Sequence, residues 1–350
     1  MTNIRDIARL AGVSVATVSR ALAKPEVVRP ATIKKVKQAI TQLGYSPNLV
    51  ASSLRRQRSD TIIVVVPDIH NPFYSGVVQG IENIAHDNGY KILLGETQNN
   101  QERLDHYTAM LTSKGADGLI LLGSRLPTIV QDSLAEDREP PIPLVLACER
   151  FDGLSSPSVE IDNVAASRLA TEHLIELGHR RIATISGPKD NPLSGDRLQG
   201  YRAALKAAHI RFDRNLVVEG DFSIRSGYAA MTRLMAQDVR PTALFCANDE
   251  MAIGAQKAAR EAGLKLPADL AMAGFDDIRF AEYAEPPLTT IAQPTVEIGE
   301  VAMRLMMGVL NGTAARGARI ILPHELIKRA SSGLASTACP GKREAGKKAS

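Results

Sequence analysis

The sequence is poor in cysteine and aromatic residues, and it has no long apolar run. Its three cysteines, Cys148, Cys246 and Cys339, lie far apart, which argues against a disulfide framework or a thiolate metal site. Tryptophan is absent, and no apolar stretch approaches the roughly 20 residues that span a bilayer. The N-terminus lacks the apolar core of a signal peptide. We therefore expect a cytoplasmic protein without a membrane partner.

Short motifs of common enzyme classes are also missing. The sequence has no GxGxxG or GxxxxGK[ST] phosphate cradle, no GxSxG elbow and no HExxH pair. Its seven histidines show no metal-ligand spacing. We expect no catalytic residues, no metal and no cofactor. An enzyme on a nucleotide-binding fold, such as a dehydrogenase or a sugar kinase, is the alternative from another class.

Charge is distributed unevenly along the chain. The net charge is +4, yet residues 1–60 alone hold 11 Lys and Arg against 3 Asp and Glu. The last 20 residues hold 4 Lys and Arg against 1 acidic residue, so the long segment between them is net acidic. A basic head on an acidic body favours contact of the head with a polyanion. A solvated basic face without a partner is the alternative.

The basic head begins with two short helices joined by a glycine turn. Apolar residues recur at helical spacing over residues 4–11, and Gly12 supplies the stop. Ser14 stands where a helix N-cap belongs, and the second helix carries Val18 and Leu22 on one apolar stripe. This order is typical of a DNA-binding helix-turn-helix. A helical hairpin in an ordinary core is the alternative.

A third helix and a hinge segment follow. Pro30 starts the stretch ATIKKVKQAITQL, which keeps helical spacing until Gly44 ends it. Asn48 can cap a further helix of about two turns, too short to be stable in water without a partner. This helix carries Leu54 beside Arg55, and an apolar residue next to cations suits a wedge in the DNA minor groove. A flexible interdomain linker is the alternative.

From residue 61 onward, apolar strands alternate with helices. The first round runs from TIIVVV to LVLACE, and after VEIDN the pattern restarts with strands such as RIATIS and ALFCAN. Each round predicts a doubly wound parallel sheet with helices on both faces, so we expect a body of two α/β lobes.

Polar and aromatic side chains follow the strands of both lobes, at the edge where such sheets bind ligands. Any one of these side chains alone is explained as a helix cap or a polar group of a loop. Together they favour a ligand site, because they follow several strands whose ends converge. The candidate ligand-binding residues are Phe73, Tyr74, Ser124, Glu149, Arg197, Phe222, Asn248 and Asp276.

The chain resembles the LacI/GalR family of bacterial repressors from residue 4 to about 330. The segments that carry the resemblance are IRDIARLAGVSVATVSRAL, LGYSPNLVASSLRR and NPFY. It implies a small all-α helix-turn-helix domain and a two-lobed α/β body like that of type I periplasmic binding proteins. The implied domains are a DNA-binding head (1–46), a hinge helix or linker (47–60), a ligand-binding and dimerisation body (61–330) and a disordered basic tail (331–350). Within the body, the implied division is lobe 1 at about 61–162 and 292–321, and lobe 2 at about 163–291 and 322–330.

The resemblance also assigns roles in DNA binding. Val15, Ala16 and Arg20 match positions that face bases in the major groove, and an arginine can donate two hydrogen bonds to guanine. Leu54 matches a leucine that intercalates at the centre of a palindromic operator. The hydroxyls of the first helical turn contact phosphates or cap the helix. The implied DNA-binding residues are Ser14, Val15, Ala16, Thr17, Ser19, Arg20, Asn48, Ala51, Leu54 and Arg55.

For the body, the resemblance implies that the three aromatic candidates stack on a ligand and that the polar ones hold its hydroxyls or ring atoms. The stretches LLLGSRLP, GPKDNPLSGDRLQGY and PPLTTIAQP are most similar to a nucleoside-responsive branch of the family. The implied effector is a nucleoside such as cytidine, with a sugar or a purine as the alternative.

The expected function is that of a ligand-responsive transcriptional regulator, a repressor that binds double-stranded DNA at a palindromic operator. The tail lacks the leucine heptads of a tetramerising coiled coil, so we expect a homodimer. Its expected place is the bacterial cytoplasm, at the nucleoid. A secreted solute-binding protein is a third interpretation, against which the missing signal peptide argues.

Overall fold

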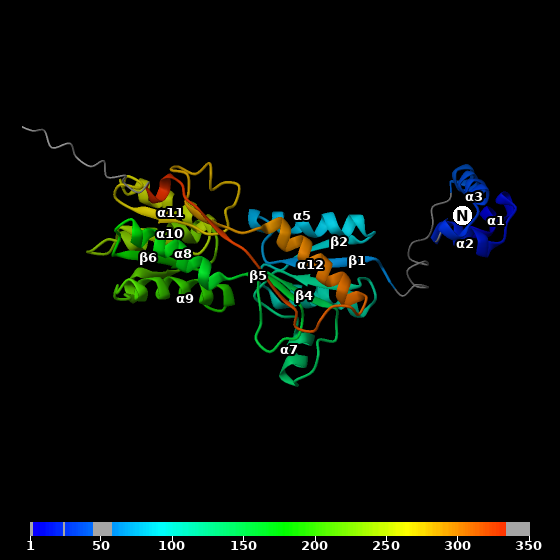
Figure 1. The fold of residues 1–350 in the computed structure, drawn as a ribbon, viewed down its shortest axis with the longest axis horizontal. Helices are drawn as coiled ribbons and strands as arrows, with labels where there is room; N and C mark the ends of the chain where they lie inside the picture. Colours follow the sequence, from blue (N-terminus) through cyan, green and yellow to red (C-terminus); the bar gives the residue numbers. More distant parts are fainter. Residues whose placement is uncertain (1–2, 24, 45–57, 334–350) are drawn as a thin grey trace, which may run out of the picture. The chain divides into compact units, whose positions relative to one another are not determined.

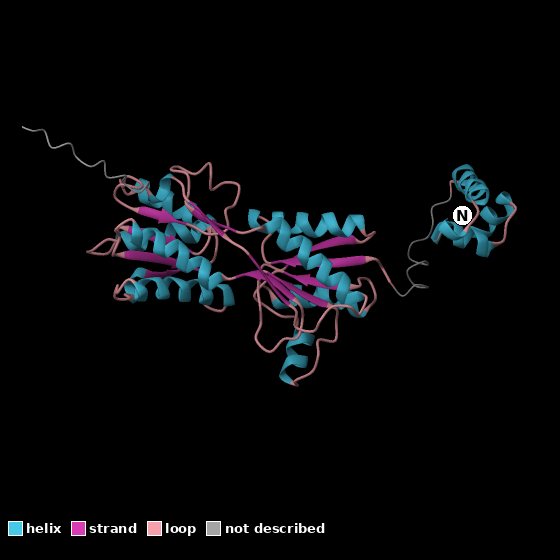
Figure 2. Cartoon of the chain, viewed as in Figure 1, coloured by secondary structure: helices cyan, strands magenta, loops and turns pink. Residues whose placement is uncertain are grey.

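The chain forms two compact units, Met1–Ser59 and Asp60–Ser350, in a computed structural model that describes residues 3–23, 25–44 and 58–333. The first unit is helical and the second is an α/β body (Figures 1 and 2). The expected DNA-binding residues Asn48, Ala51, Leu54 and Arg55 lie outside the described residues. None of the described helices is both long enough and apolar enough to cross a lipid bilayer.

The described part of the first unit is a three-helix bundle, as the sequence predicts for residues 4–43. Asn3 caps the first helix, and the carboxylate of Asp6 accepts a hydrogen bond from the Asn3 backbone in return. Gly12 ends this helix in the left-handed conformation, with φ of 63°. The hydroxyl of Ser14 then accepts a hydrogen bond from the Thr17 N–H at 3.2 Å. The elements are α1 Ile4–Ala11, α2 Val15–Ala23, a 3₁₀ turn Pro25–Val27 and α3 Pro30–Leu43.

One expected core contact of α2 is wrong. Val18 is fully buried and Ala21 is buried beside it, whereas Leu22 is 39% exposed. Positions three and four residues away lie within about 60° of the same helix face, so helical spacing alone cannot decide which of the two is covered. The buried core of the unit consists of Ile7, Ala8, Ala11, Val18, Ala21, Val36 and Ala39.

The body holds a six-stranded sheet in its first lobe, with the order β11-β5-β4-β3-β1-β2 and all neighbours parallel. Its strands are β1 Thr61–Val66, β2 Lys91–Glu96, β3 Gly118–Leu121, β4 Leu144–Ala147, β5 Ser158–Ile161 and β11 Arg319–Leu322. Its helices are α5 Pro72–Asp87, α6 Gln101–Thr112, α7 Thr128–Ala135 and α12 Thr295–Leu310. In β1, Ile62 and Val64 pack toward α5 and α12, while Ile63 and Val65 pack toward α6 and α7. This two-sided burial explains the unbroken apolar run of the strand.

The second lobe repeats this plan with a four-stranded parallel sheet of order β7-β6-β8-β9. Its strands are β6 Ile182–Ser186, β7 Val217–Glu219, β8 Ala243–Cys246 and β9 Ala271–Ala273. Its helices are α8 Asn163–Glu176, α9 Pro192–Ala207, α10 Ile224–Met235 and α11 Asp249–Glu261. Ala243 and Phe245 pack with α8 and α9, and Leu244 and Cys246 pack with α10 and α11. The all-α head and the two-lobed α/β body confirm the predicted fold class.

The chain passes between the two sheets at three places. It leaves β5 after Ile161 and enters α8 at Asn163. The other two passages are β10 Thr290–Ala292 and β12 Glu325–Ile327, which pair antiparallel (Figure 1). One cluster of buried apolar side chains continues from the α5 and α12 side of the first sheet to the α8 and α9 side of the second. The lobes therefore share part of their core.

Helices α5 and α9 begin in the same way. Asn71 and Asn191 each accept a hydrogen bond from the backbone N–H two residues further on, at 2.9 and 2.8 Å. A proline occupies the first helical position in both cases, where its missing N–H costs nothing. Because of this cap, α9 starts at Pro192.

The same two helices also pack in the same way. Nine residues after each capping asparagine stands a glycine, Gly80 in α5 and Gly200 in α9. Gly80 lies against the Val296 carbonyl of α12, and Gly200 against the Val164 carbonyl of α8. A Cβ at either glycine would overlap the neighbouring backbone. The two lobes thus use the same cap and the same close helix contact to place the first turn of each helix.

Candidate functional site

The strand ends of the two lobes enclose a small cavity of about 30 Å³. Its lining residues are Asn71, Phe73, Tyr74, Leu122, Cys148, Glu149, Asn191, Leu193, Arg197, Phe222, Asn248 and Asp276. Seven of the eight candidate ligand-binding residues are therefore brought together. Ser124 is not among them, because it lines a separate cavity of about 10 Å³ together with Leu104 of α6 and Asn100, which caps that helix.

The first turn of α5 supplies aromatic side chains to the cavity. The cap at Asn71 fixes where this turn begins, and it places Phe73 and Tyr74 among the lining residues. Their rings meet edge to face, with centroids 5.4 Å apart and planes at 78°. Burial raises the pKa of Tyr74 well above its usual value, so its phenol stays neutral and can donate a hydrogen bond.

Glu149 is the acidic group of the first lobe at this cavity, and it is only 3% exposed. One carboxylate oxygen, Oε1, accepts a hydrogen bond from Asn191 Nδ2 of the second lobe at 3.3 Å. The other, Oε2, is buried and has no hydrogen-bond partner in the described part of the chain. Burial raises the pKa of Glu149 to about 7, against the opposing effects of Asn191 and Arg197. Such an acceptor, which lacks a donor, fits a ligand that brings an N–H or O–H group.

Arg197 and Asp276 form the charged part of the second lobe's wall. The Arg197 guanidinium lies over the Phe275 ring, with Cζ 3.8 Å from the centroid, and its Nε donates to Asn163 at 3.0 Å. Its Nη1 lies 3.6 Å from Oδ1 of Asp276. That oxygen also accepts a hydrogen bond from Gln293 at 2.8 Å. Burial raises the pKa of Asp276 to about 6, although Arg197 and Gln293 oppose the shift.

Phe222 and Asn248 complete this wall and support each other. Phe222 has a left-handed backbone, with φ of 69°, and its carbonyl accepts a hydrogen bond from Asn248 Nδ2 at 2.9 Å. The Asn248 side-chain oxygen accepts from the Met251 N–H at 3.0 Å and so caps α11. The amide of Asn248 is thus engaged by the fold, and it holds the Phe222 loop at the edge of the cavity.

Several residues in the site or next to it in the chain escaped the sequence analysis, among them Asn191, which lines the cavity. Ser194 is 3% exposed, and its hydroxyl has no hydrogen-bond partner among the residues described. It is the second buried polar atom of this kind, after Oε2 of Glu149. It occupies the position in α9 that Tyr74 occupies in α5, so the repeated Asn-Pro pair could have revealed both Ser194 and Asn191. Leu122 and Cys148 carried no such signal, because an apolar residue at a strand end also fits an ordinary core.

The expected DNA-contacting face of α2 is open to solvent. Ser14, Val15, Ala16 and Arg20 are exposed, and Thr17 and Ser19 are partly buried. Within residues 3–23 and 25–44, no hydrogen bond or ion pair engages the Arg20 side chain, which leaves its five donors available. The helix therefore presents small side chains and one long cation on the side opposite its buried Val18.

Three side chains at the ends of β1 and β2 could hold a metal ion by distance alone. The ligand atoms of Asp68, His70 and Glu96 lie within 4.8 Å of one another. However, Glu96 already accepts hydrogen bonds at both oxygens, from the Ile69 N–H at 3.1 Å and from Gln98 at 3.0 Å. The Asp68 and His70 side chains are largely exposed, so this group has the character of a solvated surface cluster.

Comparison with known proteins agrees with this geometry. The family of bacterial regulatory proteins of the lacI type matches residues 3–48, and the periplasmic binding protein-like domain matches residues 171–332. The HTH-type transcriptional repressor CytR of Escherichia coli (strain K12) is 41% identical over 329 residues, which cover 94% of this chain and 96% of the relative. The ribose operon repressor of the same strain is 37% identical over 333 residues, 95% of this chain and 100% of the relative. The crystal structure of the lac repressor dimer bound to operator and the anti-inducer ONPF aligns with a TM-score of 0.84 at 30% identity, covering 95% of this chain and 99% of that one.

A helix-turn-helix head with an exposed second helix and a two-lobed body with a cavity between its sheets define a DNA-binding transcriptional regulator with a ligand-binding domain. The chain belongs to the LacI family of bacterial regulatory proteins. The resemblance found in the sequence is thereby confirmed, including its similarity to the branch that contains CytR.

Proposed function

We propose that the protein is a repressor whose operator affinity is set by a nucleoside, such as cytidine, bound in the cavity between the lobes. The observation that carries the proposal is the buried Oε2 of Glu149, which has no donor among the described residues and lies in a cavity walled by aromatic rings. The similarity to CytR supports the same choice of branch.

Different parts of a nucleoside suit the different walls of this cavity. Its planar base suits the rings of Phe73 and Phe222, and an amino group on the base can donate to Glu149. Its ribose hydroxyls can bond to Arg197 and Asp276, whose charged groups lie side by side. A plain sugar leaves the rings without a flat partner, and a free base leaves the charged pair without hydroxyls. A site with such buried polar groups rejects ligands that leave them unpaired.

Effector binding in this proposal requires the lobes to move. A cavity of about 30 Å³ has room for about two water molecules, far less than a nucleoside needs. The cleft must therefore widen to admit the ligand and then settle around it. Operator affinity changes only if the ligand binds the DNA-competent and incompetent arrangements with different affinity.

The proposal includes the DNA side of the protein. The division is a head at 1–46, a hinge at 47–60, a body at 61–330 and a tail at 331–350. Two heads of a homodimer bind the half-sites of a palindrome through the exposed face of α2, and the hinge leucine Leu54 wedges at its centre. This function places the protein in the bacterial cytoplasm at the nucleoid, without catalytic activity of its own.

A thermal-shift panel tests the effector. The purified protein is heated with cytidine, uridine, adenosine, free cytosine or ribose, and a ligand at about 100 times its Kd adds about 2.7 kcal/mol of stability. A shift with cytidine but not with cytosine or ribose supports the proposal. A shift with ribose alone, or with a free purine base alone, keeps the family and overturns the nucleoside assignment. Chromatography of the recovered cytidine checks for turnover, which would favour an enzyme.

A further inference from the structure

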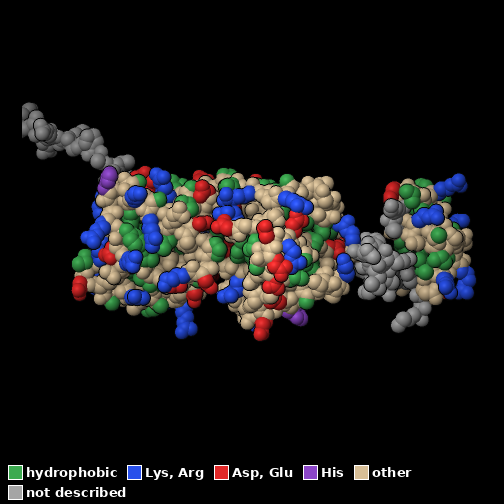
Figure 3. Space-filling view, turned by 90° about the horizontal axis from the view of Figure 1, so that it is seen from below, with side chains coloured by type: hydrophobic (Ala, Val, Ile, Leu, Met, Phe, Trp, Pro, Cys, Tyr) green, Lys and Arg blue, Asp and Glu red, His purple; other side chains and the backbone are tan. Residues whose placement is uncertain are grey.

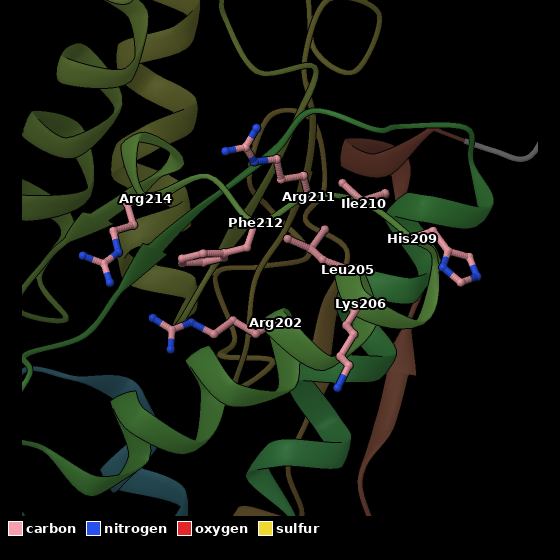
Figure 4. Close-up of a pocket in the computed structure, with 8 residues that line it drawn as sticks. All are labelled: Arg202, Leu205, Lys206, His209, Ile210, Arg211, Phe212 and Arg214. Carbon is pink, nitrogen blue, oxygen red and sulfur yellow. The ribbon is translucent and has the colours of Figure 1, made fainter.

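A second hollow lies on the other end of α9 and shares no lining residue with the cavity between the lobes. It has a volume of about 660 Å³ and is lined by Arg202, Leu205, Lys206, His209, Ile210, Arg211, Phe212 and Arg214 (Figure 4). We call it the α9 groove. Figure 3 views the body from the α9 side and shows Lys and Arg side chains spread over this part of the second lobe.

The floor of the α9 groove is apolar and anchored to the core. Leu205 is buried, and Ile210 and Phe212 are partly buried against the same apolar cluster. The Phe212 ring meets Tyr201 edge to face at 6.4 Å. The Tyr201 hydroxyl donates to the Ile182 carbonyl of the central strand β6 at 2.7 Å. The floor is therefore held by the sheet, as a preorganised ligand site requires.

The rim of the groove carries cations that lack partners. The Arg202 guanidinium lies over the Phe212 ring, with Cζ 4.5 Å from the centroid. Among the residues that the structure describes, no carboxylate lies within ion-pair distance of Lys206, Arg211 or Arg214, in contrast to many other arginines of the body. Asp213, between the last two, lies instead 3.5 Å from Arg181. The rim thus concentrates positive charge without internal compensation.

The helix end does not account for this charge. A cation in the last turn of a helix interacts favourably with the helix dipole, which explains Lys206 in α9. Arg211 and Arg214, however, follow the end of the helix at Ala207. They also stand in a body whose overall charge is net negative. Together with Arg202 they line one groove whose floor is apolar, an arrangement that suits an anionic ligand with an apolar part.

We propose that the α9 groove is a second ligand site, which binds a nucleoside phosphate or a similar phosphate ester of an aromatic or apolar molecule. The phosphate pairs with the arginines of the rim, which favour planar, bidentate contacts with phosphate oxygens. The apolar part of the ligand covers the floor formed by Leu205, Ile210 and Phe212. A volume of about 660 Å³ lies within the range of small-molecule sites.

The test is calorimetric titration of the full chain at constant ionic strength with adenosine 5′-monophosphate, cytidine 5′-monophosphate, inorganic phosphate and cytidine. The groove variant is Arg211→Gln with Arg214→Gln. The matched control is Arg225→Gln with Arg233→Gln, two exposed arginines on α10 of the same lobe, so both variants lose the same charge. Thermal unfolding of each variant verifies that the fold is intact.

We expect a nucleotide to bind more tightly than inorganic phosphate, and the groove variant to weaken its binding about tenfold or more. The control should leave its affinity unchanged. Absence of binding by either nucleotide at millimolar concentration overturns the proposal, and so does an equal loss in both variants, which would indicate diffuse surface charge. Binding that survives in the groove variant but disappears in Arg197→Gln would place the nucleotide in the cavity between the lobes instead.

Discussion

Glu149 combines burial, one hydrogen bond from the opposite lobe and one oxygen without a donor, and these features fix the direction of its pH response. Burial raises its pKa to about 7, so about half of the molecules carry a protonated carboxyl at neutral pH. A ligand N–H group bonds to the ionised form and must therefore displace a proton below this pKa. The affinity for cytidine should rise as the pH rises through 7.

The expected change is about tenfold between pH 6 and pH 8, because the ionised fraction of a group with a pKa near 7 grows by that factor. Titration calorimetry at several pH values measures it. Glu149→Gln should weaken cytidine binding at pH 8 and flatten this rise, and Glu82→Gln, an exposed glutamate on α5, is the control. A flat profile in the unmodified protein would refute the role given to Glu149.

Arg20 is the single long cation on the exposed face of α2. With no partner among the described residues, its guanidinium is free to donate to a guanine edge. Arg20→Ala should cost about 1–3 kcal/mol of discrimination at one base position of an operator selected from a random pool. Fluorescence anisotropy with base-substituted duplexes measures this, and Arg9→Ala on α1 is the control. An equal loss on random DNA would assign Arg20 to a phosphate.

At the scale of single elements, α9 offers a matched pair of glycines. A Cβ at Gly200 would overlap the Val164 carbonyl of α8, whereas Gly195 in the same helix faces open space. Gly200→Ala should therefore destabilise the protein by about 1–3 kcal/mol through overpacking. Gly195→Ala should stabilise it by up to about 1 kcal/mol, because alanine loses less backbone entropy in a helix. Urea denaturation of both variants would show opposite shifts, and similar shifts would contradict the close-contact argument.

Most elements could be predicted from the sequence, because their periodicity and caps are local properties. Three helices of the head and the alternation of the body follow from apolar spacing alone. The start of α9 could not be placed by spacing, because the cap at Asn191 and Pro192 outweighs the weaker apolar pattern of its first turn. The burial of Ala21 in place of Leu22 depends on how α2 crosses its neighbours, and a single helix does not contain that information.

At the scale of the whole molecule, each of the two units has its own core. Among the described residues, the buried cluster of the head runs from Ile7 to Ala39, and the clusters of the body begin at Ile62. A fragment of residues 60–350 should therefore bind cytidine with the Kd of the full chain and lose affinity for DNA. Calorimetry and anisotropy measure the two activities. Loss of cytidine binding by a folded fragment would show that the head takes part in effector binding.

The site itself was only partly predictable, because it forms where distant segments meet. The rule that ligands lie at strand ends found seven lining residues, from Phe73 to Asp276. The same rule chose Ser124, whose loop lies against α6 rather than the cavity. It also missed Asn191, since the hydrogen bond from its side chain to Glu149 forms only where the two lobes meet. Which residues such a contact encloses is a property of the three-dimensional fold.

Helix α9 reaches from one proposed ligand to the other. Its first turns supply Leu193 and Arg197 at the cavity, and its last turns supply Arg202 and Lys206 at the groove. Its 16 residues form a rod of about 24 Å, braced against α8 where Gly200 brings the two backbones together. A helix of this kind moves as one piece, so a shift at one end displaces the other. If a phosphate ester in the groove changes the affinity for the effector by some factor, the effector must change the affinity for the phosphate ester by the same factor. The DNA affinity of the regulator would then depend on two metabolites, whose sites are coupled through one helix.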